Sequence, residues 1–271
     1  MTDYTDFLST VERYYAHHGR HDLPWRLPES DGSFNPYKIL VSEIMLQQTQ
    51  VPRVIPKYEA FLQRFPTINT LANVPLGDVL VAWQGLGYNR RAKFLWLAAQ
   101  KVVHEFDNQL PNDQAKLESL PGIGVNTAGA IRAYAFNEPV VFVETNIRTV
   151  YIHHFFKGKT GIPDTAVRTV LGETLDRRDP RVFYWSLMDY GSYLKQVIGN
   201  LSSASKGYAK QSKFAGSARQ IRGRVLRLLA SGMLSEVALL DELGDTRAAA
   251  ILADLTSEGL ILKANDYYRL P

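Results

Sequence analysis

The sequence predicts a mainly α-helical protein, and three observations support this prediction. Apolar residues recur at helical spacing through most of the chain, most clearly in residues 36–50, where Leu40, Val41 and Ile44 lie on one face of a helix. Proline, glycine and asparagine divide the chain into segments of about 10 to 16 residues, a length typical of helices in globular proteins. Sequence typical of strands is scarce until the C-terminal end.

The expected helices can be followed in order along the chain. After residues 36–50, the same apolar spacing and the same interruptions predict helices at residues 54–65, 76–83, 90–106, 113–119, 147–156, 166–175 and 181–198. With 271 residues, the chain is long enough for two or three compact units that each bury a core.

A glycine-rich turn follows the helix at 113–119 and precedes a helix at 127–134. Pro121 ends the first helix, and Gly122 and Gly124 can adopt positive φ without steric cost. The amide groups of such a turn, together with the positive end of the following helix, can bind a phosphate. An ordinary turn between two helices is the alternative interpretation.

Basic residues are concentrated in one part of a chain whose formal net charge is only +4. Residues 190–235 contain no aspartate or glutamate, and they hold Lys195, Lys206, Lys210, Lys213, Arg219, Arg222, Arg224 and Arg227. We interpret this run as a footprint for a DNA backbone, and a solvated basic face is the alternative.

The composition excludes several classes of protein. The chain has no cysteine, so disulfides, thiolate metal sites, cysteine nucleophiles and cysteine-held iron–sulfur clusters are excluded. The N-terminal residues do not resemble a secretory leader, and no apolar run approaches the length of a membrane span. We expect a soluble, cytoplasmic protein with no membrane partner, and nothing requires it to be more than a monomer.

The C-terminal part is expected to form a separate small module. Residues 199–217 are small, polar and basic, which is the composition of a linker. Helices are expected at 218–230, 235–243 and 246–257, followed by short strands at 260–263 and 267–270. This order is that of a winged helix, which can place its third helix in a DNA groove or serve only for protein contact or packing.

Two glutamates are candidates for chemistry. Glu43 lies at the edge of the apolar face of the helix in 36–50, where partial burial favours a proton donor. Glu144 follows the β-prone residues 140–143 and precedes a helix, where it could also be an ordinary N-cap. Two carboxylates at one site would supply the acid and the cation-stabilising partner that break a glycosidic bond.

Several motifs, in their order along the chain, resemble the adenine DNA glycosylases of the MutY type, within the helix-hairpin-helix DNA glycosylase superfamily. The resemblance covers roughly residues 15–191. It rests on the segments HDLPWR (21–26), PYK (36–38), VSEIMLQQTQV (41–51), GLGY (85–88) and LPGIGVNTAGA (120–130).

The resemblance implies a two-domain helix-hairpin-helix glycosylase fold with DNA crossing a cleft. A six-helix barrel domain would comprise residues 33–136, and a second helical domain would combine residues 1–32 with 137–200. Residues 201–216 would form the basic linker, and residues 217–271 the winged-helix-like module.

The resemblance also implies roles for individual residues. Glu43 would protonate the target base, with Glu144 at the position of a family aspartate and Asn146 helping to hold the water and the sugar. Three groups of residues complete the site: Trp25, Arg26 and Trp185 at the base pocket; Gln48, Tyr88 and Leu86 at the DNA wedge that contacts the opposing base; and Gly122, Gly124, Asn126, Thr127, Lys206, Lys210 and Lys213 at phosphates. Backbone carbonyls of Glu118, Leu120 and Ile123 would bind a monovalent cation, Na⁺ or K⁺.

The chain departs from the family pattern at four places. Glu144 is one methylene longer than the family aspartate, and Trp185 replaces a polar residue that helps read adenine. The cysteine ligands expected after residues 188–191 are absent. The C-terminal module is not the Nudix-like domain that recognises 8-oxoguanine. Apart from these four departures, Asn126 occupies the position at which bifunctional relatives such as endonuclease III carry a Schiff-base lysine.

These observations predict a monofunctional DNA glycosylase of base excision repair, without an iron–sulfur cluster and associated with the nucleoid. Its partner would be double-stranded DNA with a mismatch or lesion, most simply adenine opposite guanine or 8-oxoguanine. A thymine or uracil mismatch glycosylase, and a non-catalytic protein that binds lesions, are the two alternatives.

Overall fold

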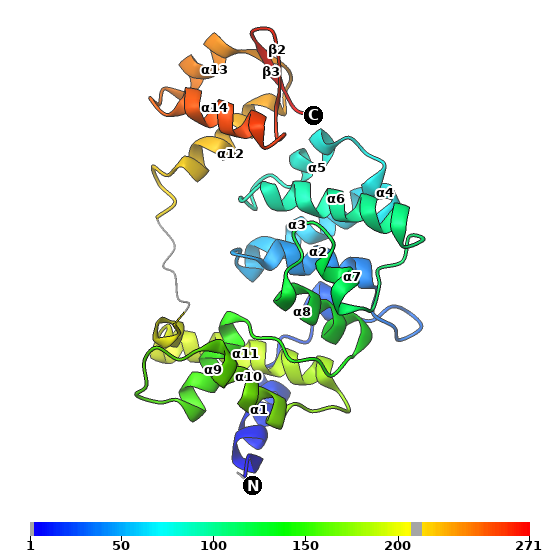
Figure 1. The fold of residues 1–271 in the computed structure, drawn as a ribbon, viewed down its shortest axis with the longest axis vertical. Helices are drawn as coiled ribbons and strands as arrows, with labels where there is room; N and C mark the ends of the chain where they lie inside the picture. Colours follow the sequence, from blue (N-terminus) through cyan, green and yellow to red (C-terminus); the bar gives the residue numbers. More distant parts are fainter. Residues whose placement is uncertain (1–2, 207–212) are drawn as a thin grey trace. The chain divides into compact units, whose positions relative to one another are not determined.

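The fold is known from a computed structural model, which describes residues 3–206 and 213–271. It is mainly helical, as the sequence predicts (Figure 1). The chain packs into two compact units. Unit 1 takes the described residues within 1–39, 112–118 and 123–210, and unit 2 takes those within 40–111, 119–122 and 211–271.

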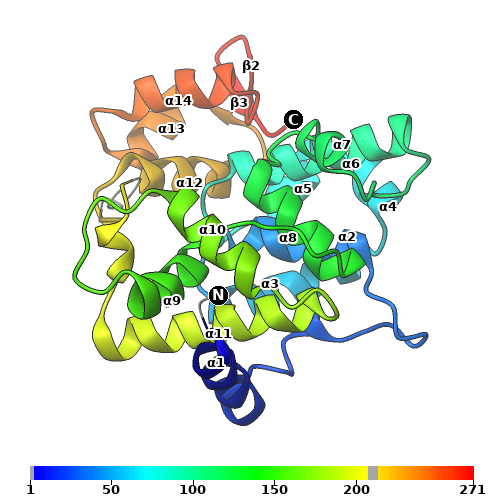
Figure 2. The ribbon, with the colours of Figure 1, turned by 60° about the horizontal axis from the view of Figure 1, so that its bottom comes forward.

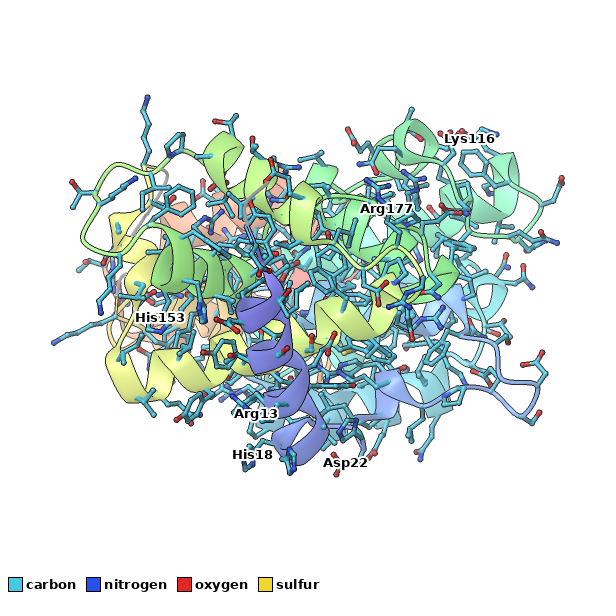
Figure 3. All side chains as sticks on the ribbon, turned by 90° about the horizontal axis from the view of Figure 1, so that it is seen from below. Arg13, His18, Asp22, Lys116, His153 and Arg177 are labelled. Carbon is cyan, nitrogen blue, oxygen red and sulfur yellow. The ribbon has the colours of Figure 1, made fainter. Side chains whose placement is uncertain are left out.

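Unit 1 is built around its longest helix, α11. Its α-helices are α1 (Thr5–His18), α7 (Gln114–Glu118), α8 (Val125–Phe136), α9 (Thr145–Phe155), α10 (Asp164–Thr174) and α11 (Pro180–Ile198), and its 3₁₀ turns are η1 (Pro24–Arg26) and η2 (Leu201–Ala204). Helix α11 packs against α1, α8 and α9 (Figure 2). The Asp179 side chain caps α11 by accepting from the Val182 amide, and Pro180 occupies its first turn. Figure 3 shows the exposed Arg13 and His18 on α1.

Unit 2 contains the remaining helices and a small sheet. The helices are α3 (Val51–Arg64), α4 (Ile68–Ala72), α5 (Leu76–Ala82), α6 (Arg90–Glu105), α12 (Ala218–Leu229), α13 (Glu236–Leu243) and α14 (Ala248–Ser257). Helix α6 buries a stripe of small and apolar residues, including Leu95 and Val102, where it packs against α4 and α5. Helix α2 (Pro36–Leu46) begins in unit 1 and enters unit 2 at Leu40.

The C-terminal residues form three helices and a three-stranded antiparallel sheet (Figure 1). Strand β3 (Tyr267–Arg269) lies between β1 (Leu234–Ser235) and β2 (Leu262–Ala264). The order of three helices followed by a hairpin agrees with the sequence, whereas β1, between α12 and α13, was not expected. Assignment to the winged-helix class stays a prediction.

Two differences from the expected elements have physical causes. The helix expected over 36–50 ends at Leu46, because the next residues turn and Gln48 adopts a φ of 57°. Residues 140–143 form no strand: the carbonyls of Val140 and Val141 and the amide of Val143 pair with side chains instead of a neighbouring strand. The expected domain boundaries stay a prediction; by packing alone, α8 groups with α11 in unit 1, and residues 213–271 group with unit 2.

Candidate functional site

The glycine-rich turn joins α7 to α8, and the two helices pack on each other. Gly122 has a φ of 80°, and a Cβ there would lie 2.7 Å from the Cβ of Phe94, so both the conformation and the space require glycine. Gly124 is instead extended, with a φ of −98°, because it is the N-cap residue of α8. The N-cap residue Gly124 has no side chain that could cap α8, and the positive end of a helix is suited to an anion. Thr127, in the first turn of α8, is half-buried.

Asn126, on the first turn of α8, holds two other segments of unit 1. Its Oδ1 accepts from Nη2 of Arg168 at 2.8 Å and from the amide of Val143 at 3.4 Å. The same guanidinium donates through Nη1 to the carbonyl of Val141 at 2.9 Å. Arg168 and Asn126 therefore fix the extended residues that lead directly to Glu144.

Two further contacts fix that extended segment. The hydroxyl of Tyr184 donates to the carbonyl of Val140 at 2.6 Å. Phe142 is buried with its ring 4.2 Å from that of Tyr184, and a Cβ at Gly129 would lie 2.8 Å from the Cβ of Phe142. The backbone before Glu144 is thus held from α8, α10 and α11 without belonging to a sheet.

Glu144 precedes α9 but does not act as a side-chain cap. Its carboxylate makes no capping hydrogen bond to the described residues, although its backbone carbonyl accepts from the amide of Arg148 at 2.8 Å. Burial raises the pKa of Glu144, and the positive charges of Arg148 and Lys195 act in the opposite direction. Arg148 is fixed by two hydrogen bonds of 2.8 Å to Asp164. The carboxylate therefore lies in a protected position beside two cationic groups.

The beginning of α9 is also held by α11 and by the 3₁₀ turn after it. A Cβ at Gly191 would lie 2.3 Å from the carbonyl oxygen of Asn146, so only glycine permits this approach of α9 and α11. In η2, the Ser202 hydroxyl donates to the carbonyl of Thr145 at 3.4 Å and lies 3.3 Å from the hydroxyl of Thr149. Asn146 thus lies on a firmly supported turn next to Glu144.

Glu43 lies on α2, within unit 2, and is half-buried between two buried residues, Ser42 and Ile44. Arg91, which is 8% exposed, caps the C-terminal end of α2. The guanidinium of Arg91 donates to the carbonyls of Ile44 at 2.7 Å and Met45 at 3.0 Å, and also to that of Gln47. Arg91 therefore satisfies carbonyls that the end of a helix leaves without partners.

Arg91 also holds the loop that carries Tyr88. Its Nη2 donates to the carbonyls of Leu86 at 3.2 Å and Gly87 at 3.1 Å, and to the hydroxyl of Thr49 at 3.0 Å. Burial lowers the pKa of Arg91 to about 10, which is still far above neutrality. One buried cation thus links the segments that carry Glu43, Gln48 and Tyr88.

The three residues expected at the DNA wedge lie in different environments. Gln48 is exposed and Tyr88 is half-buried, and both adopt left-handed backbone conformations, with φ of 57° and 48°. Such conformations are uncommon outside glycine and cluster at functional sites. Leu86 is 3% exposed and packs in the interior of unit 2. Gln48 and Tyr88 also line a groove of about 630 Å³.

The residues expected at the base pocket are buried inside unit 1. Arg26 forms a two-bond ion pair with Asp189, at 2.8 and 2.9 Å, and Trp25 is 6% exposed. Burial acts to raise the pKa of Asp189, but hydrogen bonds from Arg26 and Arg20 hold it below its usual value.

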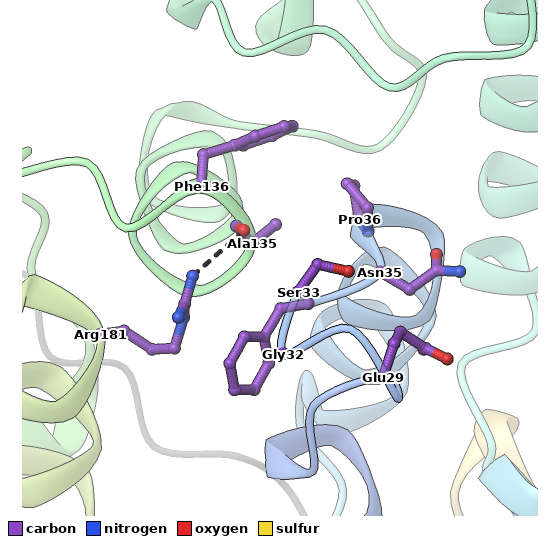
Figure 4. Close-up of a pocket in the computed structure, with 9 residues that line it drawn as sticks. Glu29, Gly32, Ser33, Asn35, Pro36, Ala135, Phe136 and Arg181 are labelled. Atoms are coloured by element: carbon purple, nitrogen blue, oxygen red, sulfur yellow. Dashed lines mark hydrogen bonds between the residues drawn. The ribbon is translucent and has the colours of Figure 1, made fainter.

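Trp185 lies beside this ion pair and is 7% exposed. Its ring centroid lies 5.5 Å from that of Phe34 and 5.4 Å from the Arg26 guanidinium. A separate pocket of about 440 Å³ includes Phe34 but none of the expected base-pocket residues (Figure 4). There, Arg181 donates to the carbonyl of Ala135 at 3.2 Å.

The basic run divides into residues with and without a structural role. Lys206 and Lys213 are exposed, and Lys210 lies outside the described residues. Arg222 pairs with Glu258, and a nitrogen of Arg224 lies 3.8 Å from an oxygen of Glu242. Part of the run therefore stabilises unit 2, which the sequence interpretation did not foresee.

The cation site expected at the carbonyls of Glu118, Leu120 and Ile123 stays a prediction. Carbonyl oxygens are suitable donors for a monovalent cation, so the chemistry fits. The carbonyl of Ser119, between two of the expected ligands, accepts from Nζ of Lys101 at 3.1 Å. Among residues 3–206 and 213–271, no helix is long and apolar enough to cross a membrane.

Comparisons with known proteins agree with the motifs. Residues 41–173 match the model of the HhH-GPD superfamily base excision DNA repair protein. An adenine DNA glycosylase of Mycolicibacterium smegmatis is 34% identical over 229 residues, which cover 78% of this chain and 76% of that protein. One from Buchnera aphidicola subsp. Baizongia pistaciae is 37% identical over 218 residues, 77% of this chain and 60% of that protein. The chain spans less than half of several other relatives of the same name.

Solved structures agree in fold. A thermostable thymine-DNA glycosylase superposes with a TM-score of 0.60 and 24% identity, over 70% of this chain and 88% of that one. A non-covalent complex of endonuclease III with DNA gives a TM-score of 0.60 and 16% identity, over 74% of this chain and 91% of that one. At these identities the likeness concerns the fold.

Proposed function

This chain belongs to the HhH-GPD superfamily of base excision DNA repair proteins, and from that premise we propose that it is a monofunctional DNA glycosylase that removes mispaired adenine from double-stranded DNA. The proposal rests mainly on the similarity of this chain to adenine DNA glycosylases, one of which is 34% identical over 76% of its own length. The target would be adenine opposite guanine or 8-oxoguanine, in DNA of the nucleoid. The domain arrangement expected from the sequence belongs to the same proposal.

Glu43 and Glu144 divide the chemistry in this proposal. Half-buried Glu43 donates a proton to the adenine ring and makes the base a better leaving group. Glu144, as a carboxylate, stabilises the positive charge that develops on the sugar as the glycosidic bond breaks. Asn146, on the supported first turn of α9, orients the attacking water.

The absence of an amine at position 126 supports a hydrolytic reaction. The side chain of Asn126 accepts hydrogen bonds from Arg168 and the backbone, so it acts as a positioning residue for the segment before Glu144. Without a lysine there, no Schiff base forms with the sugar at this position. The enzyme would work without an iron–sulfur cluster, since the sequence has no cysteine to hold one.

Phosphate contacts complete the proposal. The amides at the start of α8 and the turn at Gly122 would bind one phosphate, and a Na⁺ or K⁺ ion held by the hairpin carbonyls would support it. Exposed Lys206 and Lys213, together with Lys210, would contact the DNA backbone without reading sequence.

Single-turnover excision on a panel of duplexes tests the function. The panel carries adenine opposite 8-oxoguanine, guanine or thymine, and thymine or uracil opposite guanine, with hot alkali to cleave abasic products. We expect adenine release that falls about 100-fold or more in Glu43→Gln, the lower end of general-acid effects. Glu59→Gln, at an exposed carboxylate on α3, is the matched control and should keep the wild-type rate.

The other outcomes of the panel assign other functions. Release of thymine or uracil would indicate a pyrimidine mismatch glycosylase, for which the surroundings of Trp185, beside the Arg26–Asp189 ion pair, would be the first place to look. Tight binding with no release of any base would indicate a non-catalytic lesion-binding protein.

A further inference from the structure

The pocket at Phe34 and Phe136 lies wholly within unit 1, and none of the residues assigned to catalysis lines it (Figure 4). Its lining comes from three segments that are far apart in the sequence, namely residues 29–36, the end of α8 and the first turn of α11. Its volume of about 440 Å³ lies within the usual range for small-molecule sites. The pocket is therefore large enough for a compact ligand.

The wall formed by residues 29–36 is fixed before any ligand binds. The amide of Glu29 donates to the carbonyl of Ser33 at 2.8 Å, and the amide of Gly32 donates to the carbonyl of Glu29 at 2.9 Å. The Glu29 carboxylate also pairs with Lys38 at 2.7 Å. Because this wall is already ordered, a ligand pays little entropy to bind against it.

Arg181 forms a second wall and keeps part of its guanidinium available. Its Nε donates to the carbonyl of Tyr134 at 2.6 Å and its Nη2 to that of Ala135 at 3.2 Å, which occupies one edge of the group. A guanidinium has five N–H donors, and Nη1 of Arg181 has no acceptor among residues 3–206 and 213–271. Burial lowers the pKa of Arg181, so an anion held against Nη1 would stabilise the charged form.

Two phenylalanine rings supply apolar surface beside this cation. Phe136 is half-buried and lines the pocket, and its ring contacts no other aromatic ring in the described part of the chain. Phe34 lies 3.9 Å from the Arg181 guanidinium, a contact that keeps the cation against the apolar surface. Figure 4 shows Phe136 and Ser33 on different sides of the pocket. A planar ring can therefore stack on Phe136 with polar groups on its other side.

The remaining polar groups suit a ligand with both donors and acceptors. Oδ1 of Asn35 accepts from the amides of Tyr37 and Lys38, at 3.0 and 3.3 Å, so its Nδ2 is turned away from them and can donate to a ligand. The Ser33 hydroxyl can donate or accept, and the Glu29 carboxylate can accept. A bare phosphate would leave the rings of the pocket unused, and an uncharged aromatic compound would leave the guanidinium unused.

We propose that this pocket binds a nucleotide, with its base against Phe136 and its phosphate against Arg181. A nucleotide combines a planar ring with polar edges, a sugar hydroxyl and an anionic phosphate, and these groups match the lining. The same chemistry is found in a free mononucleotide and at the end of a DNA strand. The inference goes beyond the proposed function, because the pocket contains none of the residues assigned to base excision.

Ligand titration of the full chain without DNA tests the proposal, with dissociation constants measured from the proton NMR signals of the ligand. The probe is dCMP, because cytosine is not among the bases whose release the duplex panel measures. Deoxycytidine lacks the phosphate, and 2-deoxyribose 5-phosphate lacks the base. We expect each to bind at least about 10-fold more weakly than dCMP, since stacking on a ring and pairing with a guanidinium each contribute about that factor.

A trinucleotide of deoxycytidine with a 5′-phosphate distinguishes the two sources of the ligand. Binding as tight as that of dCMP, or tighter, would identify the end of a DNA strand. Binding weaker by about 10-fold or more would identify the free mononucleotide, because the pocket would then exclude a continuing chain.

Four variants locate the binding. Phe136→Ala should weaken dCMP about 10-fold and leave 2-deoxyribose 5-phosphate unchanged, whereas Phe156→Ala, at a half-buried ring outside the pocket, should bind dCMP like the wild-type protein. Arg181→Lys keeps the charge but not the planar fork, so it should weaken dCMP and leave deoxycytidine unchanged. Arg132→Lys, at a half-buried arginine on α8 outside the pocket, is its matched control. Circular dichroism melts verify that each variant is folded.

Three results would overturn the proposal. Equal binding of dCMP and deoxycytidine would remove the role of Arg181, and unchanged binding of dCMP by Phe136→Ala would place this ligand elsewhere on the protein. The third is a lack of dCMP binding at about 1 mM, the weak end of specific affinities. Because the titrations contain no DNA and use no catalytic variant, their failure leaves the proposed function intact, and failure of the duplex panel leaves this test decisive.

Discussion

Arg91 provides the sharpest test of how unit 2 is held together. Arg91→Met preserves the apolar stem but removes the guanidinium that bonds to six oxygens, which belong to Ile44, Met45, Gln47, Thr49, Leu86 and Gly87. Three of these bonds, to the carbonyls of Ile44, Met45 and Leu86, are fully buried. At about 1 kcal/mol for each carbonyl left without a partner, the variant loses about 3 kcal/mol.

This loss corresponds to a lower melting temperature, by about 6–12 °C for a unit of this size. Thermal unfolding followed by circular dichroism measures it. Arg90→Met is the matched control, because the Arg90 side chain is 62% exposed and its nitrogen lies 3.9 Å from Glu258. An exposed pair contributes about 0–1 kcal/mol, so this control should melt within about 2–3 °C of the wild-type protein.

Arg91→Lys distinguishes charge from hydrogen bonding. A lysine keeps the positive charge at the end of α2, but it has three donors on one atom and cannot reach both loops at once. We therefore expect a melting temperature between those of Arg91→Met and the wild-type protein. If Arg91→Met melted within about 2 °C of the wild-type protein, the assignment of Arg91 as the link between these segments would be wrong.

Three further predictions concern unit 1. Burial raises the pKa of Glu144 and the charge of Lys195 lowers it, so Lys195→Met should raise this pKa further. Because the active form is the carboxylate, which exists above its pKa, the acid limb of the single-turnover rate profile should move to higher pH. An unchanged acid limb, or an equal movement in Lys195→Arg, would contradict this prediction. Sodium borohydride should trap no covalent adduct with abasic DNA, because Asn126 offers no amine, and a stable adduct on a denaturing gel would refute the monofunctional assignment. Gly191→Ala places a Cβ 2.3 Å from the carbonyl of Asn146 and should cost about 1–3 kcal/mol in urea unfolding, whereas an unaltered midpoint would show that α9 and α11 separate easily.

Local sequence pattern was enough to predict most of the helices. Helix α6 has the repeating small and apolar residues of a one-sided helix, and the structure gives it bounds within one residue of those expected. Helix α1 was missed because its buried side is narrow, with only Phe7 and Val11 buried among its described residues. Helix α4 was missed because five residues, capped by Thr67, are too few for a periodic signal.

The contacts that organise the candidate site could not be read from local pattern. Arg91 and Arg168 each lie on a helix, where an arginine is ordinarily a solvated residue. Both donate to backbone carbonyls more than 25 positions away, Arg91 to that of Ile44 and Arg168 to that of Val141, and such pairings have no signature in the sequence. The β-prone residues 140–143 also show the limit of local pattern. The sequence correctly predicts that their backbone is extended, but it does not predict that side chains of Arg168 and Tyr184, rather than a neighbouring strand, bond to their carbonyls.

The resemblance to a family contributed what pattern could not, namely which glutamates and which aromatic residue to examine. Gln48 and Tyr88 were expected from family position, and their left-handed backbones are an independent sign that these positions are unusual. The burial of Trp25, Arg26 and Trp185 was beyond reach of a linear motif, because only the folded chain brings Asp189 beside Arg26.

The 3₁₀ turn η2 shows what the support of α9 requires chemically. Its Ser202 hydroxyl supports the start of α9 through oxygen atoms, and these hydrogen bonds neither gain nor lose electrons. The support that this turn gives to Thr145 and Thr149, beside Glu144, therefore requires neither a metal nor a thiol.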